Sequence, residues 1–409
     1  MSLDDDGAGA WSAVGEAGLD EAIELRRAIH ADPEIGLHCP RTADKIKAAL
    51  AGLPLEIHDS RSTTGFVAVL RGGGSAGQGN GRTVLLRGDH DALPMHEETG
   101  LPFASLIDGA MHACGHDSHT AMLVGAAKAL SARRDQLAGT VVFMFQPGEE
   151  GYHGARYMID DGLLDIAAPE AAFALHILPN APANVLVTRA GPLMASADTL
   201  HAVIRGAGGH AAMPHDCLDP IPVACEIVTA LQTFVARRVP VTDPAVLSIT
   251  KIEAGSAHNI VPGEVKMLGT LRTLSEPTRQ LMRAAFARIV EGIAAAHGLT
   301  GEAWIEDGYP VTVNDARAVA LMEACAVDLG GAGGFQLMPA PMMGAEDFSY
   351  VLRTMPGAMA FLGAAPAGSN PATNPPLHNT RMTIEESIMA RGIALHCAVA
   401  TRFLEQGLG

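Results

Sequence analysis

Residues 140–150 read TVVFMFQPGEE, and this stretch decides the fold. The run 140–145 is apolar and rich in β-branched and aromatic residues, which predicts a strand buried on both faces. A Pro-Gly pair ends the strand, and two carboxylates, Glu149 and Glu150, follow directly. Neighbouring side chains diverge at a strand end, so one carboxylate can bind a metal while the other faces a substrate as a base. The alternative is a pair of solvated loop carboxylates.

Two further runs of the same kind lie on either side of this strand in the chain, at 83–86 and 172–175. A helical pattern at 121–130, which Asp117 or Ser118 can cap, separates the first run from the central one. Buried strands that alternate with helices predict an α/β fold with a mostly parallel sheet covered by helices on both faces.

The pattern changes between residues 192 and 306. Segments follow there in the order strand, helix, strand, strand, helix, which predicts a small α+β domain of ferredoxin-like type. The α/β pattern then resumes near Tyr309. We therefore expect a catalytic domain, 1–191 and 307–409, interrupted by an inserted domain, 192–306, as a chain of 409 residues allows.

Residues 111–119, MHACGHDSH, carry the strongest local indication of chemistry. Cys114 and His116 stand two residues apart, so in an extended chain their side chains project to the same side. A thiolate and an imidazole together suit a transition metal such as zinc. The alternative is the start of a helix with incidental histidines.

Polar residues also follow the other two predicted strands. Asp89, His90 and Asp91 come after the first, His176 ends the third, and His378 stands in a proline-rich loop. Each of these is commonly a structural or solvated group when it occurs alone, although an acid of the first set could orient a ligand imidazole. Their recurrence at successive strand ends, where open parallel sheets place ligands, indicates one shared site.

Composition and charge argue against other classes of function. Lys and Arg number 28 against 45 Asp and Glu, a net charge of −17, which disfavours a nucleic-acid surface and docking on anionic membranes. No stretch has the pattern of a membrane span or a signal peptide, and residues 1–20, acidic and rich in Gly and Ala, are expected to be a mobile lead-in. The six cysteines are scattered, so we expect reduced thiols and a cytoplasmic protein.

Taken together, these motifs resemble the M20D peptidase subfamily, which includes hippurate hydrolases, N-acyl-amino-acid amidohydrolases and plant auxin-conjugate hydrolases. The resemblance spans roughly residues 20 to 405. The matching motifs lie, in order, at 86–94, 112–119, 146–151, 154–156, 208–215, 257–262, 269–273, 344–348 and 377–379.

The resemblance implies a centre of two divalent metal ions, zinc or manganese, with cobalt or nickel also possible. Cys114 would bridge the ions, and the remaining ligands would be His116, Glu150, His176 and His378. Glu149 would be the general base and acid, and Asp91 would hold the geometry of the ligands.

For the inserted domain, 192–306, the resemblance implies a lid that also mediates assembly into a homo-oligomer, a dimer or tetramer. His210 would stabilise the oxyanion, in its own or the partner's active site. Asn259 and Arg272 would bind the carboxylate of the substrate. Two positions depart from the family pattern: His90, where relatives often have methionine, and His153, where they are often richer in glycine. We count neither as a ligand.

These features together predict a metal-dependent amidohydrolase that cleaves the amide bond of small N-acyl amino acids or similar conjugates. One alternative keeps the chemistry and changes the substrate, to a dipeptidase, a carboxypeptidase or a deacetylase of the N-acetyl-diaminopimelate type. Two others change the class, to a thiol hydrolase that uses Cys114 or to a non-catalytic metal-binding protein. The spare carboxylate of Glu149 argues against the last, because metal storage needs no base beside the ligands.

Overall fold

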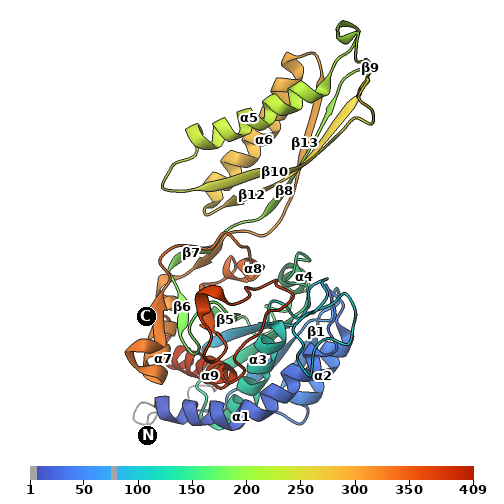
Figure 1. Cartoon of the computed structure of the whole chain (residues 1–409). Coiled ribbons are helices and arrows are strands. Elements are labelled where there is room, and N and C mark those ends of the chain that lie inside the picture. The colour runs from blue at the N-terminus through green and yellow to red at the C-terminus, as the bar shows by residue number, and fades with distance from the viewer. Residues whose placement is uncertain (1–6, 75–80) are drawn as a thin grey trace. The chain divides into compact units, whose positions relative to one another are not determined.

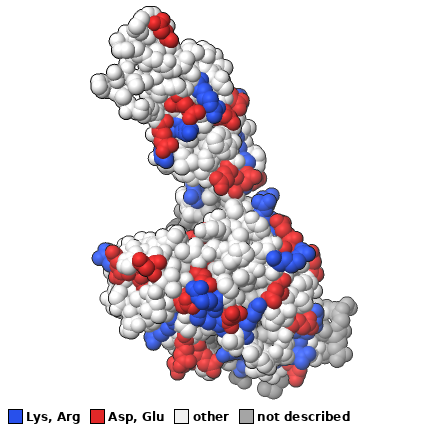
Figure 2. Space-filling model, turned by 90° about the vertical axis from the view of Figure 1, so that its right-hand side faces the viewer, with Lys and Arg blue, Asp and Glu red and all other residues white. Residues whose placement is uncertain are grey.

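The computed structural model describes residues 7–74 and 81–409 (Figure 1). The chain divides into two compact units. Unit 1 comprises Met1–Leu193, Val313–Ala340 and Tyr350–Gly409, and unit 2 comprises Met194–Thr312 and Pro341–Ser349. Within the described ranges, no helix has both the length and the apolar character that crossing a membrane requires. On the face drawn in Figure 2, acidic and basic side chains are interspersed rather than gathered by sign.

Unit 1 is built around an eight-stranded sheet. In sheet order its strands are β1 (Glu56–Asp59), β2 (Phe66–Arg71), β4 (Thr140–Gln146), β3 (Thr83–Asp89), β5 (Ala171–Leu178), β16 (Gly357–Gly363), β6 (Leu186–Thr188) and β15 (Phe335–Leu337). The central neighbours β4/β3, β3/β5 and β5/β16 run parallel, as do β6/β15, and the other three pairs are antiparallel. Every residue of β3 and β16 is buried. The predicted α/β fold with a mostly parallel sheet is confirmed.

Helices pack against this sheet and share its hydrophobic core. The longer ones are α1 (Gly7–His30), α2 (Pro40–Leu50), α3 (His116–Ser131), α7 (Ala316–Gly330) and α9 (Ile388–Gln406), and the short ones are α4 (Gly154–Asp160) and α8 (Ser349–Leu352). Ile29, Leu123 and Ile393 from three of these helices join Phe143 and Phe173 of the sheet in one buried cluster.

The expectation of a mobile lead-in at residues 1–20 is wrong from Gly7 onward, where α1 begins. Residues 1–6 lie outside the described part of the chain. The helix packs closely on α9, since a Cβ at Gly15 would lie 2.1 Å from the carbonyl oxygen of Ala390. Trp11 is buried in the same core. Tertiary packing therefore stabilises a helix whose Gly content alone predicts flexibility.

Unit 2 has a four-stranded antiparallel sheet of order β10 (Ala245–Ala254), β12 (Glu264–Thr273), β8 (Asp198–Arg205) and β13 (Thr300–Glu306). Two helices, α5 (Pro220–Arg238) and α6 (Glu276–Ala296), share a core with this sheet that includes Ile227, Val265 and Phe286. β9 (Gly209–His210) and β11 (Ile260–Val261) form a separate two-stranded sheet. β7 (Gly191–Met194) and β14 (Thr312–Asn314) pair where the chain leaves and re-enters unit 1. The lid and dimerisation roles of residues 192–306 stay predictions.

Candidate metal centre

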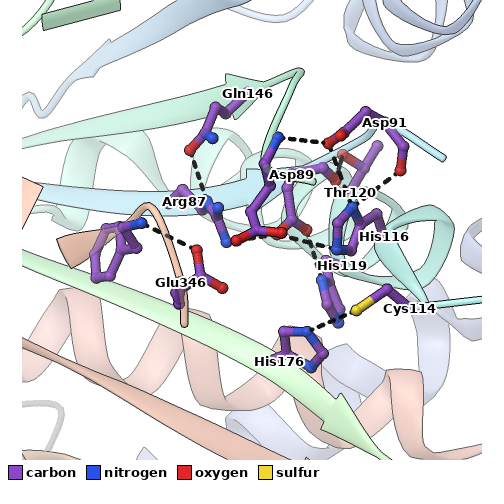
Figure 3. Close-up of polar contacts among 12 residues, drawn as sticks. Arg87, Asp89, Asp91, Cys114, His116, His119, Thr120, Gln146, His176 and Glu346 are labelled. Carbon is purple, nitrogen blue, oxygen red and sulfur yellow. Dashed lines mark hydrogen bonds and ion pairs between the residues drawn. The ribbon is translucent and has the colours of Figure 1, made fainter. Parts of the chain in front are cut away.

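The five predicted metal ligands all belong to unit 1 and gather at the carboxyl ends of its central strands. Figure 3 shows three of them, Cys114, His116 and His176. Cys114 precedes α3, and His116 is the first residue of that helix; Glu150 follows β4, His176 lies near the end of β5, and His378 stands in the loop before α9. Their donor atoms are close together. Cys114 Sγ lies 3.3 Å from His176 Nε2, and Glu150 Oε1 lies 3.2 Å from His378 Nε2 and 3.8 Å from His116 Nε2.

The segment that carries Cys114 and His116 depends on the glycine between them. Gly115 has a φ of 83°, a left-handed conformation that L side chains rarely adopt. A Cβ at this position would also lie 2.4 Å from Ile177 Cγ1. The loop of His378 is tied to the same segment, because its backbone N–H donates to the carbonyl oxygen of Ala113 at 2.8 Å.

Asp91 organises the turn that carries the two glutamates. Its carboxylate accepts hydrogen bonds from the backbone N–H of Glu149 at 3.0 Å and of Glu150 at 3.1 Å. Its carbonyl oxygen accepts from His116 Nδ1 at 2.9 Å. Nδ1 of that imidazole therefore carries a proton, and Nε2, which faces Glu150, is the nitrogen that can bind a metal. This arrangement can hold two ligands in a fixed direction.

One donor atom of this centre, His116 Nε2, is buried without a hydrogen-bond partner among the described residues. Buried polar atoms of this kind need a partner. Three sets made up of predicted site residues bring their donor atoms within 4.8 Å of one another. The sets are Cys114, His116 and His176; Cys114, Glu150 and His378; and His116, Glu149 and Glu150. Sulfur, imidazole nitrogen and carboxylate oxygen are the donors that zinc and similar ions accept, so the residues fit a dinuclear centre.

The electrostatics of the centre favour positive charge. Burial, with the negative charge of Glu150 and Glu149, raises the pKa of the Cys114 thiol well above its ordinary value. Burial alone would lower the pKa of His116, but Asp89, Asp91 and Glu150 outweigh it and raise that pKa to about 10. Divalent cations compensate such a cluster of acids and stabilise the thiolate.

Sequence reasoning gave no role to Arg87, Gln146 or His119, and of Asp89 it said only that an acid of the Asp89–Asp91 set could orient a ligand imidazole. Asp89 is fully buried between Arg87, whose Nη1 lies 2.5 Å from its Oδ2, and His119, whose Nδ1 lies 2.6 Å from its Oδ1 (Figure 3). Arg87 Nε also donates to Gln146 Oε1 at 2.9 Å. His119 follows His116 by three residues on α3, a spacing that places two side chains on one helix face. That spacing was the feature of the sequence that could have indicated a place for His119 beside the metal centre.

The two histidines that depart from the family pattern have different surroundings. His90 is fully buried, and neither of its ring nitrogens has a hydrogen-bond partner in the described part of the chain. His153 has a φ of 60°, and its Nδ1 lies 3.0 Å from Tyr350 Oη. Neither belongs to a set of candidate ligands among the described residues. That they are not ligands stays a prediction.

His210, Asn259 and Arg272 all belong to unit 2. The first two are neighbours, because the N–H of Ala211 donates to the carbonyl oxygen of Asn259 at 3.1 Å. His210 is exposed, and its Nδ1 accepts from the N–H of Ala212 at 3.1 Å. Burial lowers the pKa of Arg272, which lies on β12. Their contribution to the site in unit 1 stays a prediction.

Comparison with known proteins identifies the group to which this chain belongs. Residues 85–402 match the profile of peptidase family M20/M25/M40. The chain is a member of this family. An N-acetylcysteine deacetylase of Bacillus subtilis is 38% identical over 343 residues, which cover 83% of this chain and 87% of that protein. Thermostable carboxypeptidase 1 of Saccharolobus solfataricus is 34% identical over 388 residues, which cover 94% and 95%.

A solved structure agrees with these likenesses. A dinuclear metal-binding peptidase of the M20 family from Bacillus subtilis superposes with a TM-score of 0.80 at 33% identity and covers 95% of this chain and 99% of that one. The predicted resemblance to the M20 family is therefore confirmed. This M20 member is a metal-dependent hydrolase that uses two divalent metal ions.

Proposed function

We propose that this M20 enzyme hydrolyses the amide bond of small N-acyl amino acids and releases an organic acid and a free amino acid. The observation that supports this most is the Glu149–Glu150 pair, whose backbone N–H groups are both held by Asp91. Glu150 is the proposed ligand of the pair, and Glu149, 6% exposed, is the proposed base in the same site. The likeness to an N-acetylcysteine deacetylase supports the substrate class.

In the proposed mechanism, Cys114, His116, Glu150, His176 and His378 hold the two ions. The ions, when bound, polarise the scissile carbonyl and acidify the attacking water. Glu149 takes the proton of that water and later delivers it to the leaving amine, which otherwise departs badly. Asp91 keeps the Glu149 backbone in register with the ligands through its bond of 3.0 Å to the N–H of Glu149.

Unit 2 supplies the remaining proposed roles. His210 stabilises negative charge on the carbonyl oxygen as the tetrahedral intermediate forms. Asn259 and Arg272 bind the carboxylate of the amino-acid part. We also propose that the enzyme is a cytoplasmic homo-oligomer whose assembly involves residues 192–306, which sedimentation velocity of the full chain tests. A monomer that is fully active would contradict a role for the partner's His210.

A second candidate function is cleavage of dipeptides or of C-terminal residues, and the likeness to a carboxypeptidase over 94% of this chain favours it. The discriminating test measures free amine released from N-acetyl, N-benzoyl and indoleacetyl amino acids and from dipeptides. Each substrate is tested with purified, chelator-stripped and Zn- or Mn-restored enzyme. Activity on the acyl amino acids that disappears on stripping and returns with metal supports the proposal. Activity confined to dipeptides would support the second candidate function instead.

The same assay addresses the thiol-hydrolase alternative. A catalytic thiolate needs a low pKa, whereas burial raises the pKa of Cys114. We expect chelation to abolish turnover. Turnover that survives complete removal of metal would favour the thiol mechanism instead.

A further inference from the structure

His119, in the first turn of α3, is a buried histidine that none of the roles above uses. It is 1% exposed, and its Nδ1 lies 2.6 Å from Asp89 Oδ1 (Figure 3). Its Nε2 lies 2.9 Å from the backbone nitrogen of Ile177. A backbone N–H can only donate, so Nε2 is the acceptor and the single ring proton is on Nδ1, donated to Asp89. Both ring nitrogens are thus engaged within the protein, which leaves His119 without a lone pair for a metal.

The hydrogen bond from Ile177 N–H to His119 takes the place of a backbone hydrogen bond to β3, which does not extend this far along β5. β3 and β5 pair only as far as Arg87 and Ala174, whereas β3 stays paired with β4 as far as Asp89. β5 continues beyond that point with β16 on its other side. The side chain of His119 therefore provides the acceptor for a backbone N–H at the end of β5, where the pairing with β3 has already stopped.

Ile177 is the pivot between His119 and the ligand His176. Its N–H is held by His119, and its carbonyl oxygen accepts from Nδ1 of His176 at 2.7 Å. The proton of His176 is therefore on Nδ1, and its Nε2 is left facing Cys114 Sγ at 3.3 Å. A displacement of the Ile177 backbone would turn the His176 ring away from Cys114.

Two glycines allow α3 to approach the strands closely enough for this bond. A Cβ at Gly88 would lie 3.1 Å from the carbonyl oxygen of His119, and a Cβ at Gly115 would lie 2.4 Å from Ile177 Cγ1. Asp89 is in turn fixed by Arg87 at 2.5 Å, and Arg87 by Gln146 at 2.9 Å. The cationic guanidinium keeps the buried carboxylate ionised, so Asp89 accepts a hydrogen bond from the Nδ1–H of His119 and favours the tautomer with its proton on Nδ1.

We propose that His119 is a positioning residue for the metal centre. The buried chain from Gln146 through Arg87 and Asp89 sets its tautomer, and His119 then holds the backbone of Ile177, whose carbonyl oxygen orients the His176 ring. This inference rests on the role of His176 as a metal ligand in the proposed function. It assigns His119 no contact with substrate.

Two substitutions separate the two hydrogen bonds of His119. In His119→Asn the amide lies near the position of Nδ1, so it can donate to Asp89 but cannot reach the Ile177 N–H. In His119→Gln the amide oxygen lies near the position of Nε2 and can accept from Ile177. Loss of a group that orients a ligand typically weakens metal binding about 10- to 100-fold. We expect that loss in His119→Asn for at least one Zn²⁺ ion, and affinity close to that of the unsubstituted enzyme in His119→Gln.

Zn²⁺ affinity is measured by competition with a chromophoric chelator, and the visible spectrum of the Co²⁺-loaded enzyme reports the ligand geometry. The matched control is His396→Asn, because His396 is also a buried histidine, 2% exposed, but lies on α9 and belongs to no set of candidate metal ligands among the described residues. This control should leave both readouts unchanged. In kinetics, His119→Asn should recover kcat at saturating metal with an unchanged KM.

Equal Zn²⁺ affinity in His119→Asn and the unsubstituted enzyme would overturn the inference, as would an equal loss in the Asn and Gln variants. If thermal melting shows that His119→Asn does not fold, Asp89→Asn provides the test, since it removes the charge that selects the tautomer. Unchanged affinity in that variant refutes the inference. Zn²⁺ affinity is measured without substrate, so the two proposals can fail separately. If the unsubstituted enzyme does not hydrolyse acyl amino acids but His119→Asn still loses Zn²⁺ affinity, only the proposed function is refuted.

Discussion

Gly115→Ala should damage the metal centre through a single methyl group. The new Cβ would lie 2.4 Å from Ile177 Cγ1 and 2.8 Å from its Cδ1, and φ at this position is 83°. An alanine in the left-handed region costs about 1–2 kcal/mol, and an extra methyl in a packed interior costs about 1–3 kcal/mol. We therefore expect the free energy of unfolding to fall by about 2–5 kcal/mol. Metal binding should weaken as well, because Cys114 and His116 flank the added methyl.

Gly100→Ala is a matched control that separates the two costs. Its φ is 70°, but a Cβ there meets no atom within 4 Å, so only the backbone cost of about 1–2 kcal/mol applies. Both variants are unfolded with urea in the presence of chelator, which gives the stability of the metal-free protein. Each is then reconstituted with Zn²⁺, and the bound metal is counted.

A double-mutant cycle with Ile177→Ala tests the cause of the clash. Ile177 is fully buried, so this change alone destabilises by about 2–5 kcal/mol. It also removes the two carbon atoms that the methyl added at Gly115 would meet, so the double variant should be more stable than the sum of the single effects predicts. Strict additivity, or equal stability of the Gly115→Ala and Gly100→Ala variants, would refute the argument.

Three other changes test separate parts of the molecule. Glu149→Gln should keep both ions but lower kcat about 10²- to 10⁴-fold; loss of metal, or full turnover, would contradict the assigned role. Asp198→Asn should destabilise unit 2 by about 3–5 kcal/mol, since Arg279 and Arg283 lie 2.6 and 3.0 Å from Oδ1 of this buried carboxylate. Thermal unfolding measures this loss, and the number of bound metal ions should stay unchanged. For His30, burial lowers the pKa, but hydrogen bonds to Asp117 and Glu97 outweigh it and raise the pKa from 6.5 to about 9. The stabilising effect of protonated His30 is therefore complete below pH 6.5 and disappears as pH rises through about 9. The difference in free energy of unfolding between the unsubstituted enzyme and His30→Gln should shrink over that range. A difference independent of pH would contradict this.

The central strands were predictable because burial on both faces leaves a continuous apolar run in the sequence. The runs expected at 83–86, 140–145 and 172–175 lie within β3, β4 and β5. Strand order and direction were not predictable in the same way. The antiparallel pairing of β2 with β4 depends on contacts between distant segments, which local pattern does not record.

The N-terminal helix shows a different limit of sequence reasoning. Residues 7–20 are rich in small residues, which favour flexibility when the chain is isolated. In the folded chain the absence of a side chain at Gly15 lets α1 approach the carbonyl oxygen of Ala390. A small residue that weakens a helix locally can therefore stabilise it through close packing, and only the position of α9 reveals which effect is larger.

Within the site, the prediction went furthest for residues that carry an unusual chemical pattern. The Cys114–His116 spacing and the Glu149–Glu150 pair could be recognised as they stand. The pairing of Asp89 with His119 could not, since a buried acid and a buried histidine are each ordinary until the 2.6 Å bond between them is known. Whether these residues perform the roles proposed for them is decided by the variants above.

The location of the metal centre follows from strand order. Because β3 and β4 are parallel neighbours, their ends meet at Asp89 and Gln146, and Asp91 can reach the N–H groups of both glutamates beyond β4. β5 lies on the other side of β3 but separates from it before His176, so the ligand at its end needs support from a helix instead of a strand. α3 can give that support only where glycine allows close approach. Substitutions at Gly88 and Gly115 should therefore impair metal binding before they unfold the sheet, whose apolar pattern they leave intact.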